Sequence, residues 1–390
     1  MKLYWIVIVI LLCGLFISYC LFFITKPQLH IHLESIPDSA QPNATIYLAG
    51  NINGWNPKDE KFKFVEDEKG SQWLHTPLAE GVLEYKFTRG SWESTEVDQQ
   101  GNSLPNRAYT FAKEDTLHLT ISGWEDLDGK TKKESTANEQ VIVWDSAMYM
   151  PQLDRYRRIS IYLPKGYAGE SILYPVLYML DGQNIFDSKK AFAGEWEVDE
   201  TLTKLEAAGK QAAIIVAIDH GGESRIAEYS PFVNREYGGG DGEATVRFIV
   251  ETLKPKVDTT FRILKGSQHT GIMGSSLGGL VAHFAWAKYP DVFGRIGIFS
   301  PAYWFSPEFK ELSLRPKSSV NPRIYILAGE SEGDGDVVIQ VLEMQKRLIA
   351  GGLNPSELEV RLVANGQHRE WFWAQEFEQA YLWLFDENNN

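Results

Sequence analysis

A serine at a glycine-rich turn is the residue of this sequence best suited to covalent chemistry. Ser276 stands at the centre of residues 274–278, Gly-Ser-Ser-Leu-Gly, between an apolar run and an amphipathic one. A nucleophilic serine at a sharp strand-to-helix turn needs small residues two positions before and after it, because the chain closes tightly there. The segment therefore predicts a nucleophile elbow, whereas an ordinary Gly/Ser turn would not explain why the serine ends an apolar strand.

A serine hydroxyl is a weak nucleophile until a base takes its proton, and histidine suits that task near neutral pH. In chains with this elbow the partners follow in the order serine, acid, histidine. Two histidines, His283 and His368, come after Ser276. His283 lies on the helical run behind the elbow, where we expect a packed or surface residue. His368 follows the last strand-like run, which predicts it as the base.

The acid that orients the histidine should follow the penultimate strand-like run, residues 323–329. That position offers four carboxylates, namely Glu330, Glu332, Asp334 and Asp336. One of them would hold the imidazole tautomer, and the others would form a solvated acidic loop before the next helix. Glu332 is our first choice and Asp334 our second.

A tetrahedral oxyanion requires two preorganised backbone donors. One is the amide of the residue after the nucleophile, Leu277, and the other comes from an earlier strand-to-helix loop. Residues 180–184, Leu-Asp-Gly-Gln-Asn, occupy that place. We predict the amide of Gln183 as the second donor.

These candidate groups require a scaffold of alternating strands and helices. Strand-like runs occur at 159–164, 175–182, 212–218, 269–275, 295–301, 323–329 and 358–365. Helical runs lie between them at 195–209, 243–255, 278–290 and 336–352, and a last one follows His368. This alternation predicts an α/β domain over 141–390 with a largely parallel, doubly wound sheet and reactive groups at the carboxyl ends of its strands.

The α/β part resembles the putative-esterase family of α/β-hydrolases, which includes S-formylglutathione hydrolase (esterase D), enterochelin esterases, feruloyl esterase domains and mycolyltransferases. The likeness runs from about 150 to 385 and rests on residues 151–156, 162–164, 178–184, Trp196, the elbow, and Gly366 with His368. It implies Gln183 as the second oxyanion donor and Glu332 as the acid. One departure is Gln367, where the family often has a second glycine directly before the histidine.

The region 27–126 shows alternating apolar and polar positions, as at 44–50, 82–90 and 116–122, separated by turn-forming residues. The pattern predicts a small all-β, immunoglobulin-like sandwich. Its motifs at 50–57, 84–87 and 106–107 resemble the starch- and glycogen-binding type of carbohydrate-binding module. The resemblance implies Trp55, Trp92 and Lys86 as glycan-contact residues, because an aromatic face complements the apolar face of a sugar ring. The tryptophans could instead fill the sandwich core, and related modules can serve as spacers.

Two further segments complete the predicted domain organisation. Residues 127–140 are polar and of mixed charge, which predicts an interdomain linker. Leu3 to Ile24 is a run of 22 residues without a charge, long enough to cross a bilayer, so 1–26 is predicted to be an uncleaved transmembrane anchor. We expect a single-pass membrane protein whose catalytic domain is periplasmic or extracellular.

Composition limits the partners. A formal net charge of -14 disfavours nucleic acid. The two cysteines, Cys13 and Cys20, lie in the apolar N-terminal run and leave no thiolate metal site in the folded part. We therefore expect a serine carboxylic-ester hydrolase that acts on an extracytoplasmic ester, a small molecule such as a siderophore or an acylated glycan, without a metal or organic cofactor. The alternatives are an acyltransferase on the same scaffold and a glycan-binding adaptor with an inert hydrolase domain.

Overall fold

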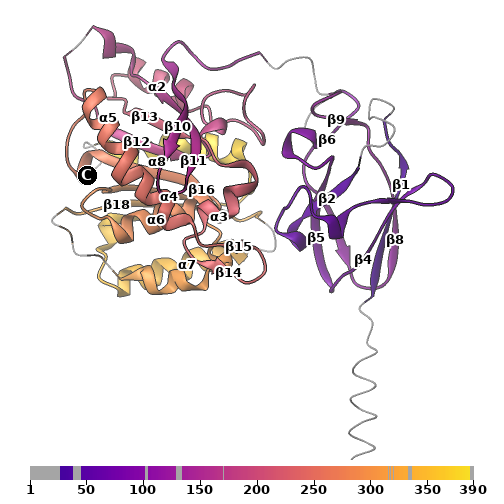
Figure 1. Cartoon of the computed structure of the whole chain (residues 1–390). Coiled ribbons are helices and arrows are strands. Elements are labelled where there is room, and N and C mark those ends of the chain that lie inside the picture. The colour runs from indigo at the N-terminus through magenta and orange to yellow at the C-terminus, as the bar shows by residue number, and fades with distance from the viewer. Residues whose placement is uncertain are drawn as a thin grey trace, which may run out of the picture. The chain divides into compact units, whose positions relative to one another are not determined.

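The computed structural model describes residues 27–37, 45–101, 104–128, 134–169, 171–314, 316, 318, 320–332 and 336–386. Within them the chain forms two compact units that divide between Lys132 and Lys133 (Figure 1). The predicted anchor at 3–24 lies outside the described residues. None of the helices in the described part is both long and apolar enough to span a bilayer.

The first unit is built from strands. One sheet has the order β3-β4-β1-β8 and a second the order β2-β5-β7, with β6 and β9 paired separately. Side chains of the two sheets share one hydrophobic cluster, which includes Ile31 of β1 together with Leu48 of β2 and Phe87 of β5. The predicted β-rich organisation of the N-terminal region is confirmed. The strands are β1 (Gln28–Ser35), β2 (Tyr47–Gly50), β3 (Val65–Glu66), β4 (Gln72–Pro77), β5 (Gly81–Thr88), β6 (Glu96–Val97), β7 (Arg107–Phe111), β8 (Asp115–Thr120) and β9 (Gly123–Trp124).

The second unit has an eight-stranded sheet of order β10-β11-β13-β12-β16-β17-β18-β19. Its first two pairings are antiparallel and the remaining five are parallel. Six of the seven predicted strand-like runs contain one of these strands, and the seventh, 159–164, overlaps the second half of β11, which begins four residues earlier. Strand β10 and its hairpin to β11 are additional. The strands are β10 (Val141–Met150), β11 (Arg155–Tyr162), β12 (Val176–Leu180), β13 (Ile214–Ile218), β16 (Thr270–Ser275), β17 (Arg295–Phe299), β18 (Arg323–Gly329) and β19 (Leu358–Val363), and a separate pair is β14 (Val233–Asn234) and β15 (Gly238–Gly239).

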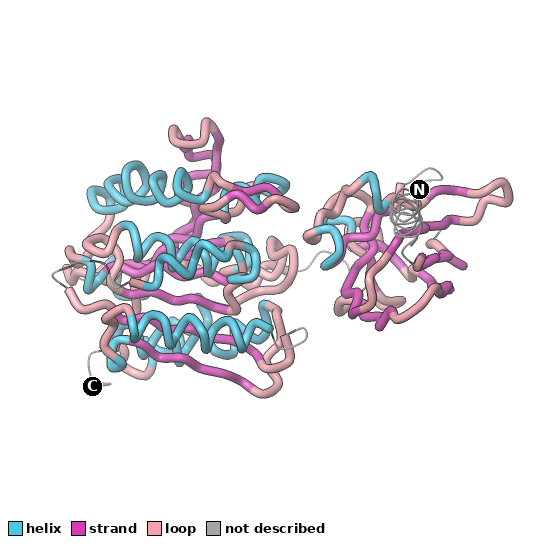
Figure 2. Tube along the Cα trace, turned by 90° about the horizontal axis from the view of Figure 1, so that it is seen from below, coloured by secondary structure: helices cyan, strands magenta, loops and turns pink. Residues whose placement is uncertain are grey.

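Helices cover both faces of this sheet (Figure 2). Leu202 of α2 and Phe377 of α8 belong to the hydrophobic cluster on one face. Val246 of α4, Leu280 of α6 and Val341 of α7 belong to the cluster on the other face. This is the predicted doubly wound α/β arrangement. The helices are α2 (Val198–Ala207), α3 (Arg225–Tyr229), α4 (Gly242–Arg247), α5 (Lys254–Thr260), α6 (Leu277–Lys288), α7 (Asp336–Ala350) and α8 (Glu370–Phe385), with a π-helix (Phe248–Leu253) between α4 and α5.

The end of the predicted linker is bonded to the second unit. The Asn138 amide donates to the buried carboxylate of Asp199 on α2. The Thr136 hydroxyl donates to Glu195, just before that helix. These bonds place residues 136–138 on the α/β unit.

Candidate active site

Ser276 stands at a strained turn between β16 and α6. Its backbone has φ 56° and ψ −121°, a combination that residues with a side chain rarely adopt. The turn is fixed on both sides, because the Ser276 amide donates to the carbonyl of Phe299 in β17 and its carbonyl accepts from the Ala302 amide. The strain costs about 1–3 kcal/mol. The packing of α6 outweighs that cost, because Leu280, Phe284 and Trp286 are buried at roughly 1.5–3 kcal/mol for each large side chain.

The glycines around the serine are sterically required. A Cβ on Gly274 would lie 2.8 Å from the backbone of Gly278, which real Cβ atoms do not tolerate. The two positions flanking Ser276 therefore touch across the turn, as an elbow demands. Leu277 opens α6, and the first amides of a helix have no intrahelical partner. The Leu277 amide is thus of the right kind to stabilise a negative oxygen.

The loop that carries Gln183 lies beside the elbow because β12 and β16 are neighbouring parallel strands. Asp181 follows β12 in a left-handed conformation, φ 55°. Its carboxylate accepts two bonds from the Arg225 guanidinium, at 2.7 and 2.8 Å, and its amide donates to the Tyr229 hydroxyl. A Cβ on Gly278 would lie 3.4 Å from that carboxylate, so the Gln183 loop reaches the start of α6.

Glu332 and His368 form a direct hydrogen bond with each other. The distance between His368 Nδ1 and Glu332 Oε2 is 2.9 Å. The Glu332 side chain is 1% exposed and that of His368 is 41% exposed. A buried carboxylate on Nδ1 fixes the imidazole so that Nε2 is the nitrogen free to act as a base. The two residues follow β18 and β19, which continue the parallel strand order β16-β17-β18-β19, so that all four strands end on the same side of the sheet.

Ser300 and Trp373, which the sequence did not single out, help to hold Glu332 in place. The Ser300 hydroxyl donates to Glu332 Oε1 at 2.6 Å and accepts from the Trp373 indole at 2.8 Å. The Gly329 amide also donates to Oε1, at 2.7 Å. The Trp373 and His368 rings pack edge to face, with 5.2 Å between their centroids. Ser300 was within the predicted strand end at 295–301, but nothing local marks it or Trp373 as partners of the acid.

The loops of Glu332 and His368 approach each other through two glycines. A Cβ on Gly329 would lie 2.2 Å from the backbone of Gly366, so neither position accepts a larger residue without a shift. The Ser331 amide donates to the Gly366 carbonyl at 3.0 Å. Gln367 is exposed, so its departure from the glycine that the family often has introduces no clash in this loop.

The remaining predicted alternatives lie elsewhere. Glu330 and Asp336 are both exposed, and Asp334 lies outside the described residues. His283 is fully buried on α6 with its Nδ1 3.0 Å from the Tyr303 hydroxyl, and burial lowers its pKa to about 4. A buried histidine of this kind packs in the core, as expected for it.

A buried carboxylic acid, Glu370, lies between the loop of Gln183 and His368. Glu370, the first residue of α8, is 7% exposed and accepts from the Asn184 side chain at 3.1 Å. Burial raises the pKa of the Glu370 carboxyl to about 7, and the nearby Asp181 adds to the effect. Asn184 in turn accepts from the Phe192 amide, so this carboxyl connects the loop of Gln183 to α8. No local pattern in the sequence marks Glu370 as part of the site.

The residues predicted to contact glycan lie in the first unit. The Trp55 and Trp92 rings are 6.4 Å apart with a 34° angle between their planes, and both residues are partly exposed. Lys86 on β5 donates from Nζ to the Leu104 carbonyl at 2.8 Å. The two rings therefore form one aromatic surface, whereas the amine of Lys86 is engaged by the chain itself.

Comparison with known families decides the classification of the second unit. The family model described as "Putative esterase" matches residues 151–384, more than half of the chain. The chain belongs to this esterase family. The uncharacterized protein YbbA of Bacillus subtilis is 25% identical over 248 residues, which covers 60% of this chain and 94% of YbbA.

Other similarities concern the first unit and the whole fold. The N-terminal region of this esterase is 37% identical over 95 residues to an alpha-amylase of Niallia circulans, covering 24% of this chain and 7% of the amylase. The enterobactin esterase FES of Shigella flexneri has a similar fold over 92% of each chain, with a TM-score of 0.50 and 16% identity. An α/β-hydrolase-like domain after a β-sheet region is thus a known combination.

The bond to His368 makes Glu332 the acid whose charge should matter for turnover. We predict that Glu332→Gln lowers kcat for p-nitrophenyl acetate roughly 100-fold or more, because a neutral amide neither selects the tautomer nor stabilises the imidazolium. The matched control is Glu330→Gln, an exposed neighbour, which should change kcat by no more than about twofold. Equal losses in the two variants would contradict the assignment.

The raised pKa of Glu370 makes stability depend on pH. Because its pKa is raised in the folded state, the folded chain holds a proton that the unfolded chain has released between about pH 4.5 and 7. The stability linked to this group is therefore present at low pH and lost as the pH rises to about 7. Glu370→Gln, which stays neutral, should gain stability over wild type on going from pH 5 to pH 8, by roughly 1 kcal/mol or more.

Calorimetry of the unfolding transitions at both pH values measures this gain. The exposed Glu330→Gln serves as the control, with a difference from wild type that does not change with pH. An offset for Glu370→Gln that is the same at pH 5 and pH 8 would count against a buried, protonated carboxyl.

Proposed function

We propose that this protein is a serine carboxylic-ester hydrolase in which Ser276, His368 and Glu332 form a catalytic triad. The observation that carries the proposal is the bond from a buried Glu332 carboxylate to Nδ1 of a partly exposed His368. The strained elbow at Ser276, at the end of β16 in the same parallel part of the sheet, supports it. An adaptor with an inert hydrolase domain would have no need to keep this arrangement.

The mechanism follows from the chemistry of these groups. His368 Nε2 takes the proton of the Ser276 hydroxyl as its oxygen attacks the ester carbonyl carbon. The tetrahedral oxyanion accepts bonds from the Leu277 and Gln183 amides, and collapse expels the alcohol, which receives the proton from His368. Water then attacks the acyl-enzyme with His368 again as base, releasing the acid and restoring the serine. Neither a metal nor an organic cofactor enters this sequence of steps.

The substrate we propose is a siderophore or an acylated glycan. The likeness in fold to an enterobactin esterase over both units favours a siderophore ester. The match of the N-terminal region to a segment of an alpha-amylase favours an ester on a polysaccharide. An acyltransferase is the second candidate on the same scaffold, and product analysis with an added alcohol acceptor distinguishes it, because transfer yields a new ester in place of the free acid.

We further propose that the first unit binds α-glucan through Trp55 and Trp92. Their adjacent rings, 6.4 Å apart and partly exposed, offer two apolar faces for stacking on neighbouring sugar rings. Lys86 contributes less in this proposal, because its amine already bonds the Leu104 carbonyl.

The nucleophile is tested by removing one oxygen. Ser276→Ala should reduce hydrolysis of p-nitrophenyl acetate roughly 1,000-fold or more while the unfolding temperature stays close to that of wild type, because only the attacking atom is lost. Ser356→Ala, at an exposed serine before β19, is the control with unchanged turnover. Wild-type activity in purified Ser276→Ala would disprove the assignment.

The glycan site is tested by pull-down on insoluble starch and glycogen. Trp55→Ala and Trp92→Ala should each lower retention roughly 10-fold, since stacking of one ring contributes about 1–1.5 kcal/mol. Trp73→Ala on β4 is the matched control, because its ring lies on the other sheet. A wild-type chain that is not retained would leave the first unit without a glycan-binding role.

A further inference from the structure

Histidines gather on the outer face of one sheet in the first unit. Four of the eight histidines in the chain are there: His30 and His32 on β1, His75 on β4 and His118 on β8. On β1 they alternate with Leu29, Ile31 and Leu33, which are buried in the core. The imidazoles therefore project from the face opposite the core. The proposed esterase chemistry does not use any of these histidines.

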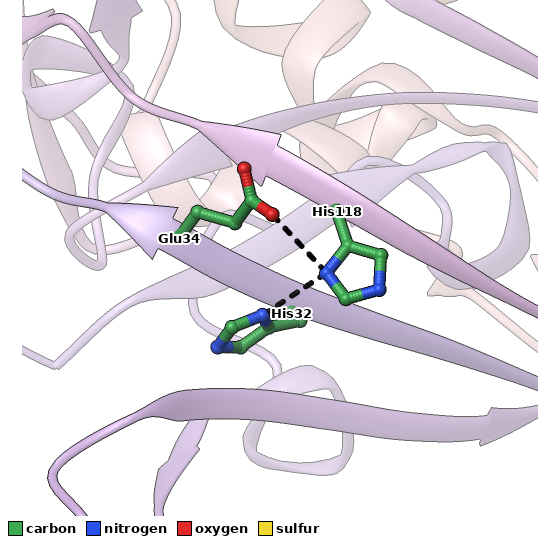
Figure 3. A group of neighbouring side chains, drawn as sticks. All are labelled: His32, Glu34 and His118. Carbon is green, nitrogen blue, oxygen red and sulfur yellow. Dashed lines mark hydrogen bonds and ion pairs between the residues drawn. The ribbon is translucent and has the colours of Figure 1, made fainter.

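Three donor atoms on this face converge on one point. Figure 3 shows the side chains of His32, Glu34 and His118 directed toward one another. His118 Nδ1 lies 3.2 Å from His32 Nδ1 and 3.4 Å from Glu34 Oε1. All three donor atoms lie within 4.8 Å of one another. They come from two neighbouring parallel strands, with His32 directly opposite His118.

Two of these separations also match the spacing of ligands around one metal ion. A charge-assisted N–H···O bond is about 2.7–2.9 Å long, well below the 3.4 Å between His118 and Glu34. A tetrahedral Zn²⁺ with bonds of about 2.0–2.2 Å to nitrogen and oxygen has donor atoms about 3.3–3.6 Å apart. The 3.4 Å between His118 and Glu34 lies within that range, and the 3.2 Å between His32 and His118 lies just below it.

A neighbouring histidine pair shows the contrast. His30 Nδ1 and His75 Nδ1 are 2.6 Å apart, too close for two ligands of one tetrahedral ion. That distance fits a hydrogen bond in which one imidazole donates to the other. The same sheet face thus carries one histidine pair that is too close to share an ion and one whose spacing allows an ion to be shared.

The backbone of β1 is adapted at the same place. The register between β1 and β8 shifts between Leu33 and Ser35, which makes Glu34 an extra residue of β1. A bulge of this kind changes the direction of a side chain and occurs often near functional residues. Here it accompanies the turn of the Glu34 carboxylate toward His118.

We propose that His32, Glu34 and His118 form a zinc site with an open fourth position. Two imidazoles and one carboxylate are ligands that Zn²⁺ accepts, whereas Mg²⁺ and Ca²⁺ prefer oxygen alone. Three protein ligands leave one position for water or an external donor. Bound Zn²⁺ would join β1 to β8 and stabilise the first unit in proportion to its affinity. The site is independent of the esterase proposal, because none of its ligands belongs to the second unit.

The test is metal titration of the full chain, purified in detergent without a polyhistidine tag and stripped with EDTA. Co²⁺, whose visible absorption reports tetrahedral coordination, should bind with one equivalent and be displaced by Zn²⁺. His118→Gln and His32→Gln should each weaken binding 10-fold or more. Binding should also weaken at acidic pH, because a protonated imidazole does not bind a metal ion.

His75→Gln is the matched control, since it removes a histidine from the same face but outside the proposed ligand set. It should bind Co²⁺ as wild type does, and circular dichroism of each variant verifies that the strands are intact. A wild-type chain that takes up no Co²⁺ below millimolar concentration overturns the site. So does a loss in His75→Gln as large as that in His118→Gln, or a folded His118→Gln that binds as wild type.

Discussion

The hydrogen bond between Glu332 and His368 is the interaction around which the candidate active site is arranged. This bond joins the loops that follow two adjacent parallel strands. The backbones of Gly329 and Gly366 are in close contact there, which leaves no room for a side chain at either position. The buried Glu332 carboxylate is satisfied on its other oxygen, because the Ser300 hydroxyl and the Gly329 amide both donate to it. On the other side of the elbow, the loop of Gln183 is held by Asp181, which hydrogen-bonds to Arg225 and Tyr229.

The strained turn at Ser276 depends on the same sheet. Parallel strands deliver their carboxyl ends to one edge, so β12, β16, β17, β18 and β19 each place a functional segment there. The cost of the strained backbone is small compared with the apolar burial of α6 between the sheet and its neighbours. The site can therefore be preorganised, because the stability comes from side chains that take no part in chemistry.

The sequence predicted those features that depend on local pattern. The elbow follows from residue sizes at fixed spacing, and the strand and helix runs follow from periodicity. The acid could not be settled in this way, because Glu330, Glu332 and Asp336 differ in burial, which only the fold determines. The sequence did not point to Ser300, Trp373 or Arg225. Their hydrogen-bond partners lie 32, 73 and 44 residues away along the chain, and no local pattern marks such pairs. The alternation on β1 places His32 and Glu34 on one face, but His118 is 86 residues from His32.

The central claim is that Ser276 is an activated nucleophile in a member of this esterase family. Its most direct test is mass spectrometry of the full chain after reaction with a fluorophosphonate, which phosphonylates only activated serines. One adduct per chain is expected, located by peptide mapping on Ser276. Labelling of a different residue, or a folded wild-type chain that stays unlabelled, would contradict it.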